Sequence, residues 1–340
     1  MKIDLNKYIL LFESCQLTKG FGRTLLTDLQ RNKIEFLDNE IYDIFSTNSR
    51  TKTIAEIIDA YNDEKKEIIL DYFLFLIDNE YAFLCDKTEI DYFPKLNKNW
   101  DHPSIISNCI IDFDKVPANL EIYKIIIADL DDLGCENIQI RDFIGLPFDF
   151  LNSFLKLFEH SIVFRIELVL KFTKGLEKYN QLLSIFPRVN ELVLHTCDID
   201  IESLKGISER IYLTKELITD QNCCGIISPK YFNLNQDHFL ESTNYNSCLN
   251  RKISIDSDGI IKNCPSMANG FGKITDVRIK DIVKQEQFKA IWNIKKDLID
   301  DCKVCEFRHV CTDCRAYLET DHSLKKPAKC NYNPYEMVWE

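Results

Sequence analysis

Residues 302–314 read CKVCEFRHVCTDC, and this stretch decides how the last third of the chain is built. It holds two pairs of cysteines with two residues inside each pair, Cys302 with Cys305 and Cys311 with Cys314. Two thiolates at this spacing can bind one side of a metal centre across a tight turn. Four such soft ligands complete an iron–sulfur cluster or a zinc site. The stretch therefore predicts metal ligation.

The pattern extends in both directions from this stretch. Of the 14 cysteines, seven lie in the last third of the chain, at Cys248, Cys264, Cys302, Cys305, Cys311, Cys314 and Cys330. Residues 254–258 alternate apolar and polar side chains before Gly259, which predicts a hairpin whose turn needs the glycine. Because Cys302 to Cys311 span only ten residues, further ligands must come from afar, and Cys264 and Cys330 are the natural candidates. His309 is expected at the surface.

Composition restricts the class of protein. The net charge of −12 over 340 residues disfavours nucleic-acid binding, which needs clustered Lys and Arg. No apolar run approaches a membrane span, and the N-terminus shows no secretory signal, so a cytoplasmic protein without membrane contact is expected. Disulfides are disfavoured in that compartment, which strengthens the metal interpretation of the clustered thiols. The lone cysteines, such as Cys15 and Cys135, are expected in the core.

Residues 1–90 predict a small α+β module. Strands are expected at 8–13, 23–29, 33–37 and 81–85, with three helices between the last two strands. The spacing of Thr53 and Glu56 is that of a capping box. This order describes a winged-helix-like module. DNA binding is disfavoured because the third helix, over 63–79, is acidic and apolar rather than basic.

Residues 86–104 are expected to form a linker, and residues 104–220 alternate strand and helix patterns. Strands are predicted at 105–113, 137–140, 162–170, 191–195 and 210–214, and helices at 120–133, 148–158, 176–186 and 201–206. Repeated β–α units imply a parallel sheet, either open or a partial barrel. His195 ends one strand and is expected to be a buried polar cap rather than part of an active site.

The cysteine order resembles the SPASM domain, the auxiliary-cluster domain of many radical SAM peptide-modifying enzymes. The resemblance implies a domain over 240–340 with two [4Fe-4S] clusters. One would be held by Cys302, Cys305, Cys311 and Cys330, and the other by Cys248, Cys264 and Cys314. Family members take a fourth ligand for the second cluster a few residues before the first cysteine. Residues 241–247 contain no cysteine, so this position is open or is filled by Cys223 or Cys224.

Radical SAM enzymes carry a CxxxCxxC triplet after the first barrel strand. Here residues 114–119, which follow the first strand of the middle region, contain no cysteine, and the triplet occurs nowhere else. Residues 104–220 therefore resemble a degenerate radical-SAM-like partial (β/α) barrel. Neither S-adenosylmethionine binding nor radical SAM activity is expected, and whether the chain is an enzyme stays open.

Over nearly its full length the chain resembles the SPASM-domain peptide maturase of the grasp-with-spasm systems. Phrases at 23–32, 93–96 and 133–141 carry this resemblance together with the cysteines. It implies a PqqD-like module at 1–90 that recognises a precursor (leader) peptide, and an ATP-grasp ligase as partner. The expected peptide contact is the strip formed by 33–37 and 63–79, with the peptide as an added strand.

Three functions follow from these patterns. The first is a maturation protein for ribosomally synthesised peptides, which binds a precursor peptide and carries structural or redox clusters. The second is a redox peptide-modifying enzyme that uses an open-sited second cluster. The third is a zinc-stabilised adaptor without redox chemistry.

Overall fold

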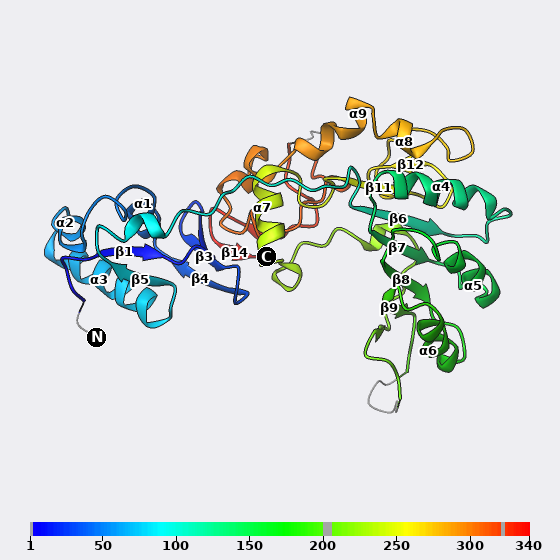
Figure 1. Cartoon of the computed structure of the whole chain (residues 1–340), viewed down its shortest axis with the longest axis horizontal. Helices are drawn as coiled ribbons and strands as arrows, with labels where there is room; N and C mark the ends of the chain where they lie inside the picture. The colour runs from blue at the N-terminus through cyan, green and yellow to red at the C-terminus, as the bar shows by residue number, and fades with distance from the viewer. Residues whose placement is uncertain (1–2, 200–205, 321–323) are drawn as a thin grey trace.

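The computed structural model describes residues 3–199, 206–320 and 324–340. The molecule is elongated (Figure 1), with the N-terminal module at one end and a large sheet with its helices at the other. Most of the cysteine-rich segment lies between these two ends, and the C-terminus comes back to the middle of the molecule. The cysteine-rich segment therefore connects the N-terminal module to the large sheet.

The first part of the chain combines two small antiparallel sheets with three helices. One sheet pairs β1 with β5, and the other has the strand order β2-β3-β4. The strands are β1 (Tyr8–Leu11), β2 (Cys15–Lys19), β3 (Thr24–Asp28), β4 (Lys33–Leu37) and β5 (Ala82–Cys85), and the helices are α1 (Asn39–Thr47), α2 (Ile54–Ile58) and α3 (Asp63–Asp78). The sequence patterns missed β2, because its only apolar side chains are those of Cys15 and Leu17.

Local signals explain the helices of this part. The Thr53 side chain accepts a hydrogen bond from the Glu56 N–H, and the Glu56 side chain accepts one from the Thr53 N–H, which is the expected capping box. Asn62 caps α3 by accepting from the Lys65 N–H. The apolar faces of the three helices pack with Ile9, Leu26 and Leu37 into one core.

The middle of the chain forms a seven-stranded sheet in the order β10-β9-β8-β7-β6-β11-β12. All neighbouring strands are parallel except β11 and β12. The strands are β6 (Asn108–Phe113), β7 (Asn137–Asp142), β8 (Arg165–Lys171), β9 (Val189–His195), β10 (Ile211–Leu213), β11 (Lys252–Ile255) and β12 (Ile261–Lys262). The expected α/β class with a large parallel sheet is confirmed. Most of the helix expected at 201–206 lies outside the described residues.

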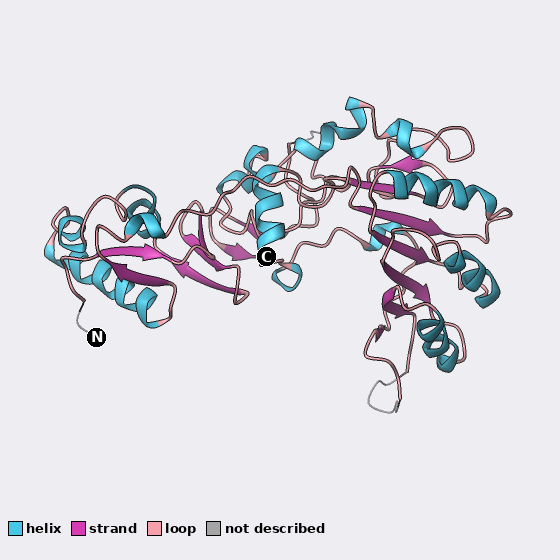
Figure 2. Cartoon of the chain, viewed as in Figure 1, coloured by secondary structure: helices cyan, strands magenta, loops and turns pink. Residues whose placement is uncertain are grey.

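Three longer helices connect these strands and cover one face of the sheet (Figure 2). They are α4 (Glu121–Asp132), α5 (Phe148–Lys156) and α6 (Leu176–Ile185). Alternate residues of β6, namely Cys109, Ile111 and Phe113, are buried with the apolar residues of these helices in one core. The side chain of Asp112, which lies between Ile111 and Phe113 in the strand, points to the opposite face of the sheet. It pairs with Arg141 of β7, so polar residues occupy the face without helices.

The cysteine-rich segment contains only short elements. Besides β11 and β12, the elements from residue 221 onward are η3 (Gln221–Cys223), η4 (Pro229–Tyr231), α7 (Gln236–Asn244), α8 (Ile279–Ile282), α9 (Glu286–Lys289), η5 (Ala290–Asn293), η6 (Lys296–Leu298), η7 (Cys302–Val304), β13 (Tyr332–Asn333) and β14 (Val338–Trp339). The linker before the large sheet contains one turn, η1 (Ile90–Tyr92). The cysteine-rich segment has little regular structure to hold it. Metal ligation and contacts with its neighbours are what can stabilise it.

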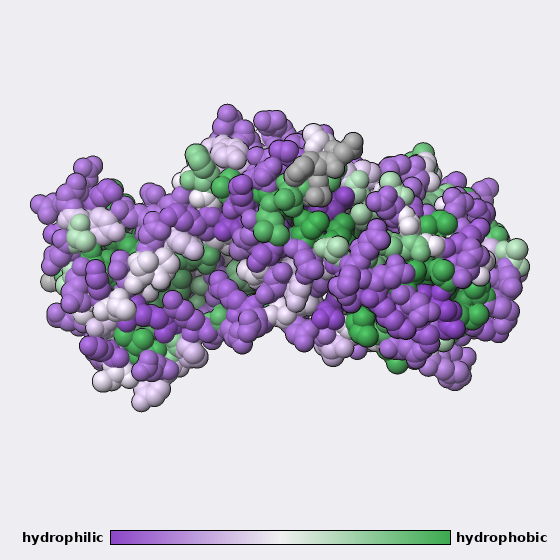
Figure 3. All heavy atoms as spheres, turned by 90° about the horizontal axis from the view of Figure 1, so that it is seen from above, coloured by the Kyte–Doolittle hydropathy of each residue, from purple (hydrophilic) through white to green (hydrophobic). Residues whose placement is uncertain are grey.

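The surface is mostly hydrophilic in the view from above, with hydrophobic patches near the middle and toward both ends of the molecule (Figure 3). Among the residues that the structure describes, no helix has both the length and the apolar character needed to cross a bilayer.

Candidate functional site

Four predicted ligands surround a single cavity. Cys302, Cys305, Cys311 and Cys330 all line it, together with apolar side chains such as Phe232, Phe307 and Trp339. Cys302 begins the turn η7, and the Cys305 N–H donates to the Cys302 carbonyl at 3.0 Å. The pair Cys302 and Cys305 is therefore held together by a tight turn. Cys330 is brought in from the last part of the chain. The resemblance to the SPASM domain implied this set of four, and all four line the same cavity.

Burial makes the thiols of Cys302, Cys305 and Cys311 poor acids unless a positive charge is present. Burial raises the pKa of Cys302 to about 12 and also raises the pKa of Cys311. A metal centre binds thiolates, so it supplies the positive charge that stabilises them. The cavity therefore has the donor chemistry of a cysteine-ligated centre.

A buried lysine lies against this first set of cysteines. Lys296 is 4% exposed, and its Nζ lies 3.2 Å from the Sγ of Cys311 and 4.0 Å from the Oδ1 of Asp313. Burial alone would lower the pKa of Lys296, but the charges of Cys311, Cys302 and Asp313 outweigh it, and the pKa is raised. A buried ammonium needs a negative charge beside it, and Asp313 supplies one at 4.0 Å.

The second set of predicted ligands also comes together. The thiol of Cys264 interacts electrostatically with that of Cys248, and the thiol of Cys314 interacts with the same residue. Lys252 lies beside them, with its Nζ 3.6 Å from the Sγ of Cys248. Each group of cysteines thus has a lysine ammonium against one of its sulfur atoms. Neither Lys252 nor Lys296 was predicted, because a lysine outside the cysteine spacing carries no signal in one sequence.

The two candidates for a further ligand are placed differently. Cys224 interacts electrostatically with Cys264 and Cys314, whereas the Sγ of Cys223 is directed to the carbonyl of Leu217 at 3.9 Å. Both cysteines are exposed. Gly225, which follows Cys224, lies so near Cys314 that an added Cβ would be 3.0 Å from its Sγ, so this part of the loop approaches the second group.

The predicted hairpin positions this group. Strands β11 and β12 pair with Ser254 opposite Lys262 and Ile255 opposite Ile261. Gly259 lies in the turn with a φ of +79°, a conformation that L side chains rarely adopt, so the predicted turn role is confirmed. Cys248 precedes β11 and Cys264 follows β12. The hairpin therefore brings two cysteines that are distant in sequence to the same end of the sheet.

A buried polar network joins the two groups. Asp313, which is fully buried, accepts hydrogen bonds from Asn246 Nδ2 and Arg315 Nη2, each at 2.7 Å. The Oδ1 of Asn246 in turn accepts from the Cys248 N–H at 3.0 Å. Asp313 lies between Cys311 of the first group and Cys314 of the second in the chain. The two sites therefore share one framework.

Within residues 3–199, 206–320 and 324–340, no group of three or more His, Cys, Asp or Glu side chains has the arrangement that would hold a metal ion. The fit to clusters rests on the cavity shared by the first group, and on the soft donors and adjacent ammonium groups of both groups. Cys15, Cys85, Cys109 and Cys135 are buried, as expected for core residues.

His309 corrects the sequence-based expectation of a surface side chain. It is 8% exposed, its Nδ1 lies 3.4 Å from the hydroxyl of Thr18, and its Nε2 lies 3.4 Å from Asp297 Oδ2. The reason is that the N-terminal module packs on the loop that contains it, which the spacing of cysteines does not reveal. His309 serves as a structural link between the two parts.

The same loop makes a strong contact with the hairpin between β2 and β3. Arg23 Nε donates to Glu306 Oε1 at 2.7 Å, and Phe21 N–H donates to the carbonyl of Val304 at 2.7 Å. Arg23 also stacks on Phe36 of β4, at 3.6 Å from the ring centre. The first group of cysteines is therefore held partly by the N-terminal module.

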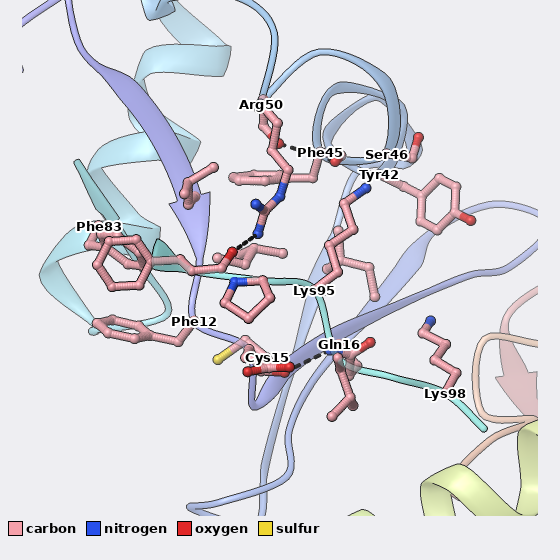
Figure 4. Close-up of a pocket in the computed structure, with 18 of the residues that line it drawn as sticks. Phe12, Cys15, Gln16, Tyr42, Phe45, Ser46, Arg50, Phe83, Lys95 and Lys98 are labelled. Atoms are coloured by element: carbon pink, nitrogen blue, oxygen red, sulfur yellow. Dashed lines mark hydrogen bonds between the residues drawn. The ribbon is translucent and has the colours of Figure 1, made fainter. Parts of the chain in front are cut away.

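The N-terminal module offers one further concave surface, a cavity of about 600 Å³ (Figure 4). Tyr42 and Phe45 of α1, Gln16 of β2 and the linker residue Lys95 line it. Arg50 crosses it and donates to the carbonyls of Ile90 and Phe93, so this guanidinium fastens the linker.

At the carboxyl end of β6, the middle sheet borders a cavity of about 590 Å³ that Phe113, Lys115 and Asp258 help to line, and no cysteine of the described residues lines it. Asp112 and Arg141 form a buried two-point ion pair, with both N–O distances at 2.7 Å. His195 is fully buried, and its Nε2 lies 2.9 Å from the carbonyl of Asp142. The expectation of a buried polar cap at His195 is confirmed.

Fold and site together define a mixed α/β protein with two groups of cysteine side chains. No family model and no curated protein matches the chain. Among solved structures, it is similar to Streptococcus suis SuiB bound to S-adenosylmethionine, with 10% identity and a TM-score of 0.33 over 94% of this chain and 98% of that chain. It is also similar to SuiB bound to the precursor peptide SuiA, with 10% identity and a TM-score of 0.31 over 95% and 99% of the two chains. Scores at this level carry no weight for function.

Proposed function

We propose that the chain is a maturation protein for a ribosomally synthesised peptide, with two [4Fe-4S] clusters in a SPASM domain over 240–340. The observation that carries the proposal is the single cavity lined by Cys302, Cys305, Cys311 and Cys330. When bound, such clusters supply structural cross-links or one-electron transfer. Cys248, Cys264 and Cys314 hold the second cluster, and the buried ammonium groups of Lys296 and Lys252 offset the negative charge of the thiolates.

The peptide is recognised by residues 1–90, as a winged-helix-like module of the PqqD-like kind. Support comes from the backbone register of the three-stranded sheet. The Gly20 N–H donates to Arg23 O at 2.8 Å, and the Leu29 N–H donates to Ser14 O at 2.9 Å. Bonded and non-bonded pairs alternate along an antiparallel ladder. By this alternation Leu25, which is opposite Thr18, bonds to β2. Its neighbour Leu26 therefore directs its backbone N–H and carbonyl toward β4.

The outer edge of β4 follows from this register. Leu26 is opposite Glu35, so the backbone of Glu35 faces β3, and the backbone groups of Ile34 and Phe36 face outward. Strand β4 pairs only with β3 in the described sheet. Tyr81, which packs against Phe75 of α3, donates to Glu35 Oε1 at 3.1 Å, so α3 lies beside this edge. A precursor peptide adds here as a strand, bonding to Ile34 and Phe36.

The middle region, 104–220, acts as a degenerate radical-SAM-like partial barrel and does not cleave S-adenosylmethionine, because it lacks the cysteine triplet. The partner that completes the chemistry is an ATP-grasp ligase in the cytoplasm. Redox modification by this chain itself is the alternative function, and a zinc-stabilised adaptor is the other.

Iron and acid-labile sulfide in anaerobically purified protein test the proposal. We expect about eight irons per chain, and about half of them in each of the variants Cys302→Ala and Cys248→Ala. Cys223→Ala is the matched control and should keep the full content. Zinc without sulfide would support the adaptor instead, and production of 5′-deoxyadenosine would contradict the reading of residues 104–220.

A further inference from the structure

We infer that Cys224 is the fourth ligand of the second cluster, so that this cluster is closed to substrates at every iron. The inference rests on the proposed function, because it presupposes clusters at the two cysteine groups. It goes further by naming the residue that completes the site and by separating Cys224 from its neighbour Cys223.

The loop that carries Cys224 is fastened to the surroundings of the ligand cysteines. Ser266, two residues after Cys264, donates its hydroxyl to the carbonyl of Gln221 at 3.1 Å. Tyr317, three residues after Cys314, donates to the same carbonyl at 3.2 Å and also lies 2.9 Å from Asn222 Oδ1. The loop is therefore tied to the segments that position two ligands of the second group.

A third attachment acts on the backbone of Cys224 itself. Lys329 Nζ donates to the carbonyls of Asn222, at 2.5 Å, and of Cys224, at 2.7 Å. The same ammonium lies 4.0 Å from the centre of the Tyr317 ring. Lys329 directly precedes Cys330 of the first group, so the loop is held from both cysteine groups.

The residue after Cys224 shows how closely the loop approaches the site. Gly225 has a φ of +88°, and a Cβ atom added there would lie 3.0 Å from the Sγ of Cys314 and 3.0 Å from the Tyr317 ring. Only glycine allows the backbone to come this near without displacing these atoms. The loop backbone therefore rests directly on a ligand thiol of the second group.

Charge agrees with this placement. Lys252 places its ammonium against this group, with its Nζ 3.6 Å from the Sγ of Cys248. The Cys223 thiol is directed instead to Leu217 O at 3.9 Å. Adjacent cysteines with the same exposure class thus have different surroundings. The ligand reaches the site from the loop after β10, and not from the segment just before Cys248.

A closed second cluster has a consequence for function. With four protein thiolates, no iron of the cluster keeps a free position for a peptide group. The second cluster then serves for structure or for electron transfer, and the alternative of a redox enzyme with an open-sited cluster loses its substrate-binding iron.

Differential alkylation of the anaerobic, iron-loaded full-length protein tests the inference without any substitution. Iodoacetamide is added briefly, before and after iron removal by a chelator under denaturing conditions. Residues 216–230 form one tryptic peptide that contains both cysteines, and its fragment ions report each thiol separately. We expect at least a tenfold slower modification of Cys224 than of Cys223 in the iron-loaded protein, and equal modification after iron removal.

Each outcome has a distinct meaning. Equal rates at Cys223 and Cys224 in a protein with the full iron and sulfide content would overturn the inference and leave the proposed function intact. Protein that contains neither iron nor sulfide would overturn the proposed function and the inference with it. The variants Cys224→Ser and Cys223→Ser give a second readout. Only Cys224→Ser should lose iron or show a cyanide-dependent change in the paramagnetic resonance spectrum of the reduced protein.

Discussion

Replacing Arg23 by methionine should detach the N-terminal module from the cysteine loop. Arg23 donates from Nε to Glu306 Oε1 at 2.7 Å and from Nη2 to the hydroxyl of Tyr332 at 3.2 Å. The Tyr332 hydroxyl donates to the same Glu306 oxygen at 2.5 Å. Glu306 Oε2 has no hydrogen-bond partner among the described residues. Arg23→Met therefore leaves a buried carboxylate with a single donor.

The structure sets the size of the effect. The Glu306 side chain is 1% exposed and that of Arg23 is 28% exposed. Removing one partner of a fully buried pair costs about 3–5 kcal/mol. Because water reaches Arg23 and screens part of the interaction, we expect a loss of about 2–3 kcal/mol in the free energy of unfolding. The Phe36 ring also loses the guanidinium that stacks on it.

Urea unfolding of the iron-loaded protein measures this loss, and hydrogen exchange at the Phe21 amide reports the contact locally, since this N–H donates to Val304 O at 2.7 Å. The double variant Arg23→Met with Glu306→Gln is the control, because it removes the buried charge along with its partner. It should be more stable than Arg23→Met alone. Unchanged Phe21 exchange with a stability loss below about 0.5 kcal/mol would refute the reasoning.

Three further changes follow from single groups. Lys296→Met removes a positive charge beside the first cluster and should lower its reduction potential by at least roughly 60 mV, a tenfold change for one electron. A redox titration followed by paramagnetic resonance, at equal iron content, measures this shift, and an unchanged potential would contradict the prediction. Gly225→Ala should cost about 1–2 kcal/mol, since its φ is +88°, and should lower the iron content; full retention of iron would contradict it. The pKa of Asp28 is lowered by its hydrogen bond to Arg31 although burial opposes this, so the stability it contributes is present above its ordinary pKa of 3.8 and is lost as the pH falls through the lowered value. Asp28→Asn should flatten that part of the acid unfolding curve, and an unchanged curve would show that Asp28 contributes nothing.

The sequence predicted the regular elements well because their signals are local. The capping box at Thr53 and Glu56 and the apolar periods of the parallel strands lie within a few residues, and the structure confirms them. Strand β2 was missed because two apolar side chains give no clear period. The turn at Gly259 was predicted because a positive φ selects glycine.

The candidate site was predictable only in part, for a related reason. Cysteine spacing indicates which thiols can share a centre, but it says nothing about groups that approach from elsewhere in the chain. Lys296 and Lys252 belong to the sites through tertiary contacts alone. The same holds for His309, which was expected at the surface and is buried because the N-terminal module packs on it. Choosing between Cys223 and Cys224 also needed the fold, since the two are adjacent in sequence.

The cysteine-rich segment therefore cannot hold its sites by itself, although its cysteine order looks like that of a separate domain. Its first loop is held by Arg23 and Phe21 of the N-terminal module. Strand β11, which follows Cys248, pairs with β6 of the middle sheet. The proposed fourth ligand, Cys224, precedes residue 240 altogether. Residues 240–340 alone would keep the seven cysteines of the SPASM-like pattern and still lack the contacts that bring them together. Two clusters held in this way would depend on the whole chain. The strand proposed to bind the peptide, β4, contacts the loop of the first group directly through Phe36 and Phe307, whose ring centroids are 5.8 Å apart.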